Sequence, residues 1–157
     1  MGTFTTKFHS AKSDWETPQN LFDVLNQRFR FTCDVAASSS NTKVKDNYFT
    51  EEQDAIQQAW KETCWCNPPY TTSLKLWAAY GLLQSHKYGS TIVMLLPCRT
   101  NTEWWHKFCM QAEEIIFLRG RPKFGDAKHG LPQPLALVVF RDHTEPIKVS
   151  SLDIRNL

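Results

Sequence analysis

Residues 67–70 read Asn-Pro-Pro-Tyr and directly follow a short apolar run at 63–66. Proline cannot donate to a β-ladder, so Pro68 and Pro69 must end the strand that precedes them. The result is a stiff loop with an amide, Asn67, at its entrance and an aromatic ring, Tyr70, at its exit. Ligands in open α/β folds gather at the carboxyl ends of strands, so this loop is a candidate site.

The chemistry that suits such a loop is the activation of an amine on a planar group. This amine is a poor nucleophile because its lone pair is delocalised into the ring or amide. The side-chain oxygen of Asn67 and the carbonyl of Pro68 offer two acceptors, which return the lone pair to the nitrogen when they bind its N–H groups. Tyr70 can stack on the planar group. If the target is a base, it must first be flipped out of its stack.

The elements expected around this loop indicate an α/β fold with a mostly parallel sheet. The run 90–97 is apolar throughout, as in a strand covered on both faces of a parallel sheet. The strand ends that carry Asp34, Asn67 and Arg99 should therefore converge on one cleft. Strands are expected to end near residue 34 and to lie at 63–66, 90–97, 114–120 and 134–140, with helices at 17–29, 54–61, 72–86 and 100–112.

Local signals place the helix starts and one buried helix face. Thr17 is expected to cap the first helix, with Pro18 at its first position. Thr100 and Glu103 have the spacing of a capping box for the last helix. The helix at 72–86, which lies between the first and the last helix in the sequence, is expected to bury a stripe formed by Leu76, Trp77, Tyr80 and Leu83.

Composition sets the limits within which these elements fold. The 157 residues fit one compact domain at 15–157 after a flexible N-terminal segment at 1–14. A net charge of +2 neither requires nor excludes a nucleic-acid partner.

Without a signal peptide or an apolar run of membrane length, we expect an intracellular, reducing setting and no membrane contact. The five cysteines are expected to be buried thiols, and no metal site is expected because zinc-ligand spacing is missing.

Six segments occur in one order along the chain: TPQNLF, FTCDVAASSSN, EEQDAIQQAW, CWCNPPY, LLPCRTNTEWWH and RGRPKF. With them the chain resembles the phage-type, Dam-like DNA N6-adenine methyltransferases from about residue 15 to residue 141. The resemblance implies a Rossmann-like methyltransferase fold and methyl transfer from S-adenosylmethionine to the N6 amine of adenine in DNA. It also implies a phage- or prophage-encoded enzyme in the bacterial cytoplasm, without an obligate protein partner. Its catalytic residues would be Asn67, Pro68, Pro69 and Tyr70.

The resemblance also assigns residues to the cofactor. Asp34 would end the first strand of the cofactor site, and Asp54 would contact the adenine amine of S-adenosylmethionine. Two simpler roles stay open, because Asp34 can cap a loop and Asp54 can favour a helix N-terminus. The turn after Asp34 has none of the glycines found in many methyltransferases, which makes positive φ costly there. The full cofactor set is Thr17, Pro18, Phe22, Asp34, Ala36, Asp54 and Asn67.

Contacts with DNA are expected from basic and aromatic residues. The short chain leaves little room for a separate recognition domain, so the basic loop at 119–133 is the main candidate, Lys128 included. Its charges can also form a plain solvated face, and Arg99 can pair with a surface carboxylate. Trp104 and Trp105 are adjacent, so at most one of them faces the core. The substrate-binding set is Arg99, Trp104, Arg119, Arg121 and Lys123.

Two other functions stay open on the sequence alone. Methyltransferases acting on RNA or on a protein glutamine use the same motif, since a glutamine amide is also planar with a delocalised lone pair. The chain can also be a nucleic-acid-binding domain that has lost catalysis, and the missing glycines are the only support for that reading. A methyl-acceptor assay separates the first alternative, and cofactor binding separates the second.

Overall fold

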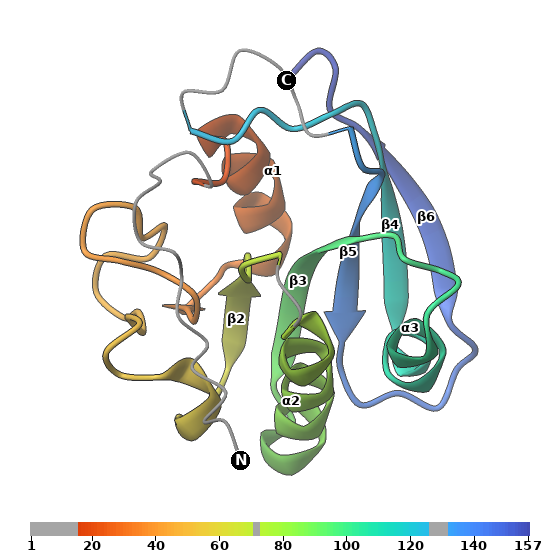
Figure 1. The fold of residues 1–157 in the computed structure, drawn as a ribbon, viewed down its shortest axis with the longest axis horizontal. Helices are drawn as coiled ribbons and strands as arrows, with labels where there is room; N and C mark the ends of the chain where they lie inside the picture. The colour runs from red at the N-terminus through yellow and green to blue at the C-terminus, as the bar shows by residue number, and fades with distance from the viewer. Residues whose placement is uncertain (1–15, 71–72, 126–131) are drawn as a thin grey trace.

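The computed structural model describes residues 16–70, 73–125 and 132–157. The expected flexible segment 1–14 and Lys128 of the basic loop lie outside these residues. Figure 1 shows one six-stranded sheet with helices packed against it. The strands are β1 (Cys33–Asp34), β2 (Thr63–Cys66), β3 (Thr91–Pro97), β4 (Glu114–Arg119), β5 (Leu135–Phe140) and β6 (Lys148–Asp153). The helices are α1 (Gln19–Phe29), α2 (Leu74–Tyr88) and α3 (Glu103–Lys107), with short 3-10 turns η2 (Ala55–Gln57) and η3 (Cys109–Gln111).

The sheet has the order β1-β2-β3-β5-β4-β6. β1, β2 and β3 pair in parallel, β5 runs antiparallel to both β3 and β4, and β6 is parallel to β4. β5 is therefore the one strand of the sheet that runs against the others, and the expected mostly parallel α/β sheet is confirmed. The carboxyl ends of the parallel strands lie on one edge, as a Rossmann-like methyltransferase fold requires.

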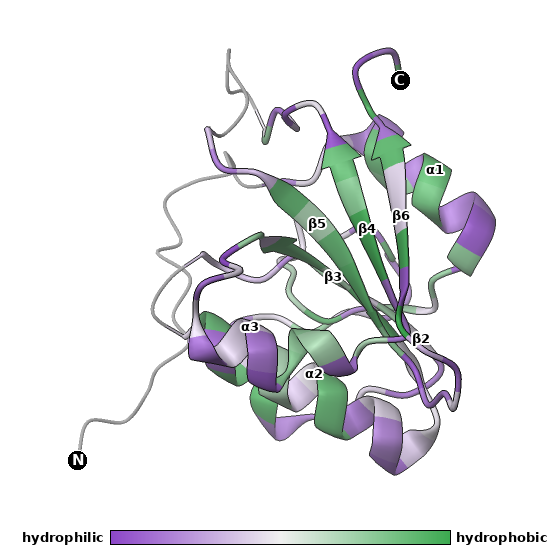
Figure 2. Cartoon of the chain, turned by 90° about the vertical axis from the view of Figure 1, so that its right-hand side faces the viewer, coloured by the Kyte–Doolittle hydropathy of each residue, from purple (hydrophilic) through white to green (hydrophobic). Residues whose placement is uncertain are grey.

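Helices cover both faces of the sheet, with α1 on one side and α2 and α3 on the other (Figure 2). β3 shows how the sequence builds this arrangement, because all of its residues are buried. Ile92, Met94 and Leu96 belong to the core under α2, whereas Val93 and Leu95 belong to the core under α1. A strand whose side chains alternate between two apolar layers reads as one continuous hydrophobic run.

The helix starts differ from those expected. At α1 the residue before the helix is Pro18, which makes no side-chain cap, so the prediction that Thr17 caps this helix is wrong. At α3 the cap is Thr102, whose hydroxyl accepts a hydrogen bond from the Trp105 N–H at 3.4 Å. The prediction of Thr100 as the cap is also wrong, since Thr102 directly precedes the helix and has the extended backbone of a capping residue.

The buried face of α2 is rotated from the expected stripe. Trp77 is buried as predicted, but Leu83 is 57% exposed, so that part of the prediction is wrong. Gly81 lies against the sheet instead, and a Cβ there would come within 2.9 Å of the Met94 sulfur. The helix approaches β3 through this small residue, and the close approach decides which side is buried.

β6 was not expected at all. It lies at the edge of the sheet and most of its side chains are exposed, so it lacks the apolar run that marks the inner strands. The expected helix at 54–61 is reduced to the single turn η2. The prediction of buried thiols holds for Cys33, Cys64, Cys66 and Cys109, while Cys98 is half-buried. None of the described helices has the length and apolar character needed to cross a bilayer.

Candidate active site

The carboxyl ends of the parallel strands β1, β2 and β3 lie at one edge of the sheet, whereas the convergence of Asp34, Asn67 and Arg99 on one cleft stays a prediction. Asp34 pairs in register with Trp65, two positions before Asn67, and Cys66 pairs with Met94 of β3. Asp34 is the last residue of β1, and Asn67 is the first residue after β2. Because these strands are neighbours and parallel, the backbone of Asp34 and the backbone of Asn67 lie at the same edge of the sheet, where ligands collect.

The side chain of Asn67 is held by the segment that precedes α1. Its amide nitrogen donates a hydrogen bond to the Thr17 hydroxyl at 3.0 Å. Thr17 is only 4% exposed, and Asn67 is half-buried. Thr17 was assigned to the cofactor by resemblance, so its contact with the motif itself is a new feature of the structure.

Asp34 organises the loop that follows β1. Its carboxylate accepts hydrogen bonds from the backbone N–H groups of Lys43, at 2.9 Å, and Ala36, at 3.3 Å. Asp34 is 3% exposed, and this burial raises the pKa of its carboxyl from 3.8 to about 6, although both hydrogen bonds oppose the change. The carboxylate therefore has the loop-capping role that the sequence left open, and a cofactor role would be added to it.

The turn after β1 forms without glycine. No residue between Val35 and Asn41 has a positive φ. The turn is closed by side chains instead, with the Ser38 N–H donating to the Asn41 side-chain oxygen at 2.7 Å. Small side chains such as Ala36 therefore suffice here, and the missing glycines are no structural argument against a ligand-binding turn.

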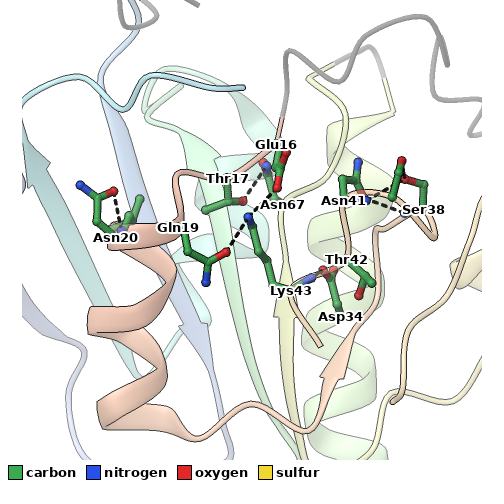
Figure 3. Close-up of polar contacts among 12 residues, drawn as sticks. Glu16, Thr17, Gln19, Asn20, Asp34, Ser38, Asn41, Thr42, Lys43 and Asn67 are labelled. Atoms are coloured by element: carbon green, nitrogen blue, oxygen red, sulfur yellow. Dashed lines mark hydrogen bonds and ion pairs between the residues drawn. The ribbon is translucent and has the colours of Figure 1, made fainter. Parts of the chain in front are cut away.

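A lysine at this edge was missed by sequence reasoning (Figure 3). The Lys43 ammonium donates to the Glu16 carboxylate at 2.8 Å and to the Gln19 side-chain oxygen at 3.1 Å. Its side chain is 5% exposed, so the ammonium is nearly enclosed by these partners. Glu16 and Lys43 are far apart in the sequence, and no local spacing signals their pairing. Only the packing of α1 against the sheet brings them together.

Tyr70 is turned toward the core. Its hydroxyl donates to the Leu95 carbonyl of β3 at 3.0 Å. Its ring lies almost perpendicular to the Phe124 ring, with centroids 6.4 Å apart. Burial raises the pKa of the Tyr70 hydroxyl well above its usual value, and the positive charge of Arg99 works in the opposite direction. A stacking role for this ring is compatible with its place beside Asn67, at the exit of the same loop.

The basic loop begins as an extended segment along the same edge. After Arg119, the last residue of β4, the side chains alternate between outside and inside. Arg121 and Lys123 are exposed, whereas Pro122 and Phe124 are buried. This alternation presents two cations to solvent and anchors the segment by two apolar side chains.

The segment is also attached through its backbone. The Gly125 N–H donates to the Glu16 carbonyl at 3.0 Å. Gly120 has φ +113, and a Cβ on it would lie 2.9 Å from the Arg155 Cγ. Glycine is therefore required where β4 turns into the basic segment, on grounds of both φ and space.

A small cavity lies beside the end of β1. Asp54 caps η2 by accepting a hydrogen bond from the Ile56 N–H at 3.3 Å, which matches the helix role left open for it. The indole nitrogen of Trp77 is buried and has no hydrogen-bond partner among the residues that the structure describes. This orphan donor belongs to a residue that lines the cavity. The cavity is lined by Val35, Phe49, Thr50, Glu51, Asp54, Ala55 and Trp77.

The remaining predicted residues are spread more widely. Phe22 is 3% exposed, with its ring centroid 5.4 Å from Phe31, so it lies in the core. Trp105 is buried and Trp104 half-buried, which confirms that one of the two faces the core.

The Arg99 side chain makes no ion pair within the described part of the chain, so the expected alternative of a carboxylate partner is not realised there. In that part, no three acidic, His or Cys side chains are grouped to hold a metal ion.

Comparison with known proteins agrees with this geometry. The profile of the family described as DNA N-6-adenine-methyltransferase (Dam) matches residues 5–156. The chain belongs to this family. The resemblance seen in the six sequence segments is thereby confirmed, and the family is one of enzymes.

Two phage proteins described as DNA N-6-adenine-methyltransferase are similar to this member of the family. The protein of Haemophilus phage HP1 (strain HP1c1) is 36% identical over 119 residues, which are 72% of this chain and 68% of the phage protein. The protein of Escherichia phage T1 is 29% identical over 107 residues, which are 66% of this chain but only 44% of the T1 protein. The second match thus covers less than half of a longer protein.

Proposed function

We propose that this chain transfers a methyl group from S-adenosylmethionine to the N6 amine of adenine in DNA. The observation that carries this proposal is the place of Asn67, which follows β2 at the ligand-binding edge beside Asp34 of β1. The family to which the chain belongs supports adenine in DNA as the acceptor. The phage origin of the two relatives supports expression in the cytoplasm of a bacterial host.

The residues around the end of β1 are suited to the cofactor. The cavity lined by Asp54 and Trp77 has mostly apolar walls and room for about one water molecule, so it is too small to enclose an adenine ring. An adenine ring needs apolar contact on its faces and hydrogen-bonding groups at its edge. As the family resemblance implies, Asp54 would accept from the cofactor's adenine amine, which requires the residues around this cavity to move apart on binding.

The methionine part of the cofactor would lie toward the other end of the site. Thr17 and Pro18 lie directly before α1 and Ala36 lies in the turn after β1, and these residues would flank it, with Phe22 behind them in the core. Asp34 would hold its ammonium group. When bound, S-adenosylmethionine supplies a methyl group activated by its sulfonium charge.

The catalytic loop acts on the amine that receives the methyl group. Asn67 and the carbonyl of Pro68 accept the two N–H groups of the adenine amine, which restores the lone pair to the nitrogen. Pro68 and Pro69 hold these acceptors in position before the base arrives, so little reorganisation is needed in the transition state. Tyr70 contacts the face of the flipped base.

The basic segment would hold the DNA. Arg121 and Lys123 point to solvent while Pro122 and Phe124 anchor the backbone, which is an arrangement suited to phosphate contact. Arg119, Arg99 and Trp104 would extend this surface around the flipped base. The cations supply affinity, and the anchored backbone keeps them at a constant distance from the catalytic loop.

Mapping of methylated adenines tests the proposal. DNA is taken from bacteria without their own adenine methylation that express either the parent chain or Asn67→Ala. We expect N6-methyladenine at a defined sequence with the parent and none with the variant. Purified protein is then offered DNA, RNA and a glutamine peptide with labelled S-adenosylmethionine. Methylation of RNA or peptide alone would overturn the choice of acceptor, and failure to bind S-adenosylmethionine would indicate an inactive binding domain.

Single substitutions test the cofactor residues. Asp34→Ala should weaken S-adenosylmethionine binding in calorimetry while the domain stays folded, and Asp54→Asn should weaken binding of both the cofactor and adenosine. Unchanged affinity in a folded Asp34→Ala protein would remove this carboxylate from the cofactor site and leave it the loop-capping role alone.

A further inference from the structure

Lys43 carries an ammonium group that is enclosed at the ligand-binding edge of the sheet. Its side chain is only 5% exposed, whereas the side chain of its ion-pair partner, Glu16, is 39% exposed. In an ordinary surface ion pair both charged groups stay in water. Enclosing an ammonium costs free energy unless its hydrogen bonds are made, so the position of Lys43 has to be explained by its partners.

The partners of the Lys43 ammonium account for two of its three N–H groups. The ammonium donates to the Glu16 carboxylate at 2.8 Å and to the Gln19 side-chain oxygen at 3.1 Å. An ammonium has three donors and cannot accept. A third acceptor for it is missing among the residues that the structure describes. The remaining N–H is therefore available to an oxygen atom of a bound molecule.

The two ends of Lys43 are attached to the two elements expected to flank the methionine part of the cofactor. Its backbone N–H donates to the Asp34 carboxylate at 2.9 Å, in the loop after β1. Its ammonium reaches Glu16 and Gln19 at the start of α1 (Figure 3). Glu16 directly precedes Thr17, one of the expected flanking residues. Lys43 thus connects the turn after β1 with the start of α1.

The methionine part of S-adenosylmethionine is a zwitterion, with an ammonium and a carboxylate on one carbon atom. Its recognition requires an anionic acceptor and a cationic donor close together. Asp34 supplies the acceptor, and Lys43 supplies a cation on the residue whose backbone binds Asp34. The two charges interact: burial raises the pKa of the Asp34 carboxyl to about 6, and the charge of Lys43 opposes this rise.

We propose that Lys43 binds the carboxylate of S-adenosylmethionine through its remaining N–H, an inference that rests on the proposed function. Glu16 and Gln19 hold the ammonium in place before the ligand arrives, so little side-chain freedom is lost on binding. A hydrogen bond between two charged groups is also stronger than one between neutral groups. Lys43 thereby selects for the amino-acid end of the cofactor.

Removal of the carboxylate from the ligand tests this contact in the parent protein. Decarboxylated S-adenosylmethionine keeps the adenosine, the sulfonium and the ammonium, and lacks only the carboxylate. Calorimetry should give it an affinity about ten- to a hundredfold lower than that of S-adenosylmethionine, the range expected for one hydrogen bond to a charged group. Equal affinities for the two ligands would overturn the proposal.

Lys43→Met, measured with the same two ligands, separates binding from a structural role. Methionine is unbranched like lysine and lacks the ammonium. The variant should bind S-adenosylmethionine about ten- to a hundredfold more weakly than the parent. Its affinity for the decarboxylated ligand should change by about threefold or less.

A purely structural lysine predicts a different pattern. If Lys43 only holds the turn after β1 against α1, Lys43→Met should weaken the binding of both ligands by the same factor, and this result would overturn the proposal. Lys43→Gln, which keeps a polar end without the charge, takes the place of Lys43→Met if that variant does not fold. It should show the same selective loss.

Lys45→Met is the matched control. Lys45 lies in the same loop and is exposed, so the substitution removes a nearby charge without touching the enclosed ammonium. It should leave the affinities for both ligands at the values of the parent. A selective loss of S-adenosylmethionine affinity in Lys45→Met as large as that in Lys43→Met would mean that any local charge has this effect, and would overturn a specific contact.

These measurements distinguish failure of this inference from failure of the proposed function. An equal loss for both ligands, with adenine methylation by the parent intact, would make Lys43 structural and leave the proposed function standing. A selective loss in Lys43→Met, with no methylation of DNA by the parent, would sustain the role of Lys43 and refute DNA as the acceptor. A parent chain that does not bind S-adenosylmethionine would overturn both.

Discussion

The rings of Tyr70 and Phe124 meet at 84°, with their centroids 6.4 Å apart. Tyr70 ends the candidate catalytic loop, and Phe124 anchors the basic segment expected to touch DNA. A contact between these two rings joins the chemistry of the site to its binding surface. It also explains why a basic segment carries a fully apolar side chain that is 3% exposed.

Phe124→Ala should destabilise the domain by about 3–5 kcal/mol, because it removes a buried aromatic side chain and leaves a cavity. Phe124→Leu should cost less, since it refills most of that volume. The measurement is the free energy of unfolding from urea titration. Phe117→Ala is the control, because Phe117 is 40% exposed and should cost clearly less. Equal losses at the two positions would mean that Phe124 is no anchor.

Tyr70→Ala should lower turnover more than DNA affinity. Of the bound DNA, the ring is expected to contact only the flipped base, whereas phosphate contacts supply most of the affinity. Base–aromatic stacking contributes roughly 1–3 kcal/mol, so the rate should fall about ten- to a hundredfold. Tyr70→Trp should retain more activity than Tyr70→Ala in the same single-turnover assay. Equal rates for these two variants would contradict a stacking role.

Asn67→Ala should lower single-turnover methyl transfer on the order of 10²–10³-fold, as expected for the loss of one preorganised catalytic hydrogen bond. Asn67→Asp keeps an acceptor in nearly the same place and should retain measurable transfer. Calorimetry should show that both variants still bind the cofactor, provided that the prolines hold the loop backbone. Transfer by Asn67→Ala at the parental rate would reduce the motif to a rigid turn.

Asp34 should make the stability of the domain depend on pH. Burial raises the pKa of this carboxyl in the folded protein from 3.8 to about 6, so the protonated form is favoured by folding. The resulting stabilisation is complete below pH 4 and is lost as the pH rises through 6, by about 3 kcal/mol in total. Asp34→Asn has no such titration. Its free energy of unfolding, relative to the parent, should therefore rise between pH 4 and pH 7 in urea titrations.

A constant difference between Asp34→Asn and the parent over this pH range would mean that the carboxyl titrates normally in the folded state. The sign is informative as well. A difference that falls with rising pH would indicate that the hydrogen bonds from Lys43 and Ala36 outweigh the burial of the charge.

DNA binding should weaken with salt through the basic segment. Replacing Arg121 and Lys123 by Ala should flatten the slope of log affinity against log salt by about one unit for each lost phosphate contact. Fluorescence anisotropy at several salt concentrations gives this slope. Lys87→Ala is the control, because Lys87 lies in the last turn of α2, away from the carboxyl ends of the strands. A slope unchanged in the double variant would make the segment a solvated face.

Much of this fold is predictable from the sequence because the inner elements carry strong local signals. β2 was expected with its observed bounds, since Pro68 and Pro69 end it, and the apolar run of β3 marks a buried strand. β6 could not be predicted, because an edge strand with exposed side chains needs no apolar pattern. The rotation of α2 depends on how closely Gly81 approaches Met94, which is a property of the packed pair and not of the helix.

The residues of the candidate site also form two groups, those that the sequence indicates and those that only the packed structure reveals. Asp34 and Asn67 are visible in the sequence because Asp34 ends a strand and Asn67 follows one, and parallel pairing then brings them to one edge. The contacts of Thr17 with Asn67 and of Lys43 with Glu16 join residues that are distant in the sequence. Thr17 was expected to cap α1 by its local position, but in the folded chain its hydroxyl accepts from the Asn67 amide, and α1 begins without a side-chain cap.

The attachment of the basic segment also bears on how new sequence preferences can arise by recombination. The segment is joined to the body of the domain by Phe124 against Tyr70 and by the Gly125 N–H on the Glu16 carbonyl. The whole segment therefore cannot simply be exchanged for the corresponding segment of a relative. A functional chimera must keep Phe124 and Gly125 from the recipient and vary Arg121, Lys123 and other outward-facing positions. Exchanges that respect these two anchors should yield active enzymes with altered target sites far more often than exchanges that cut across them.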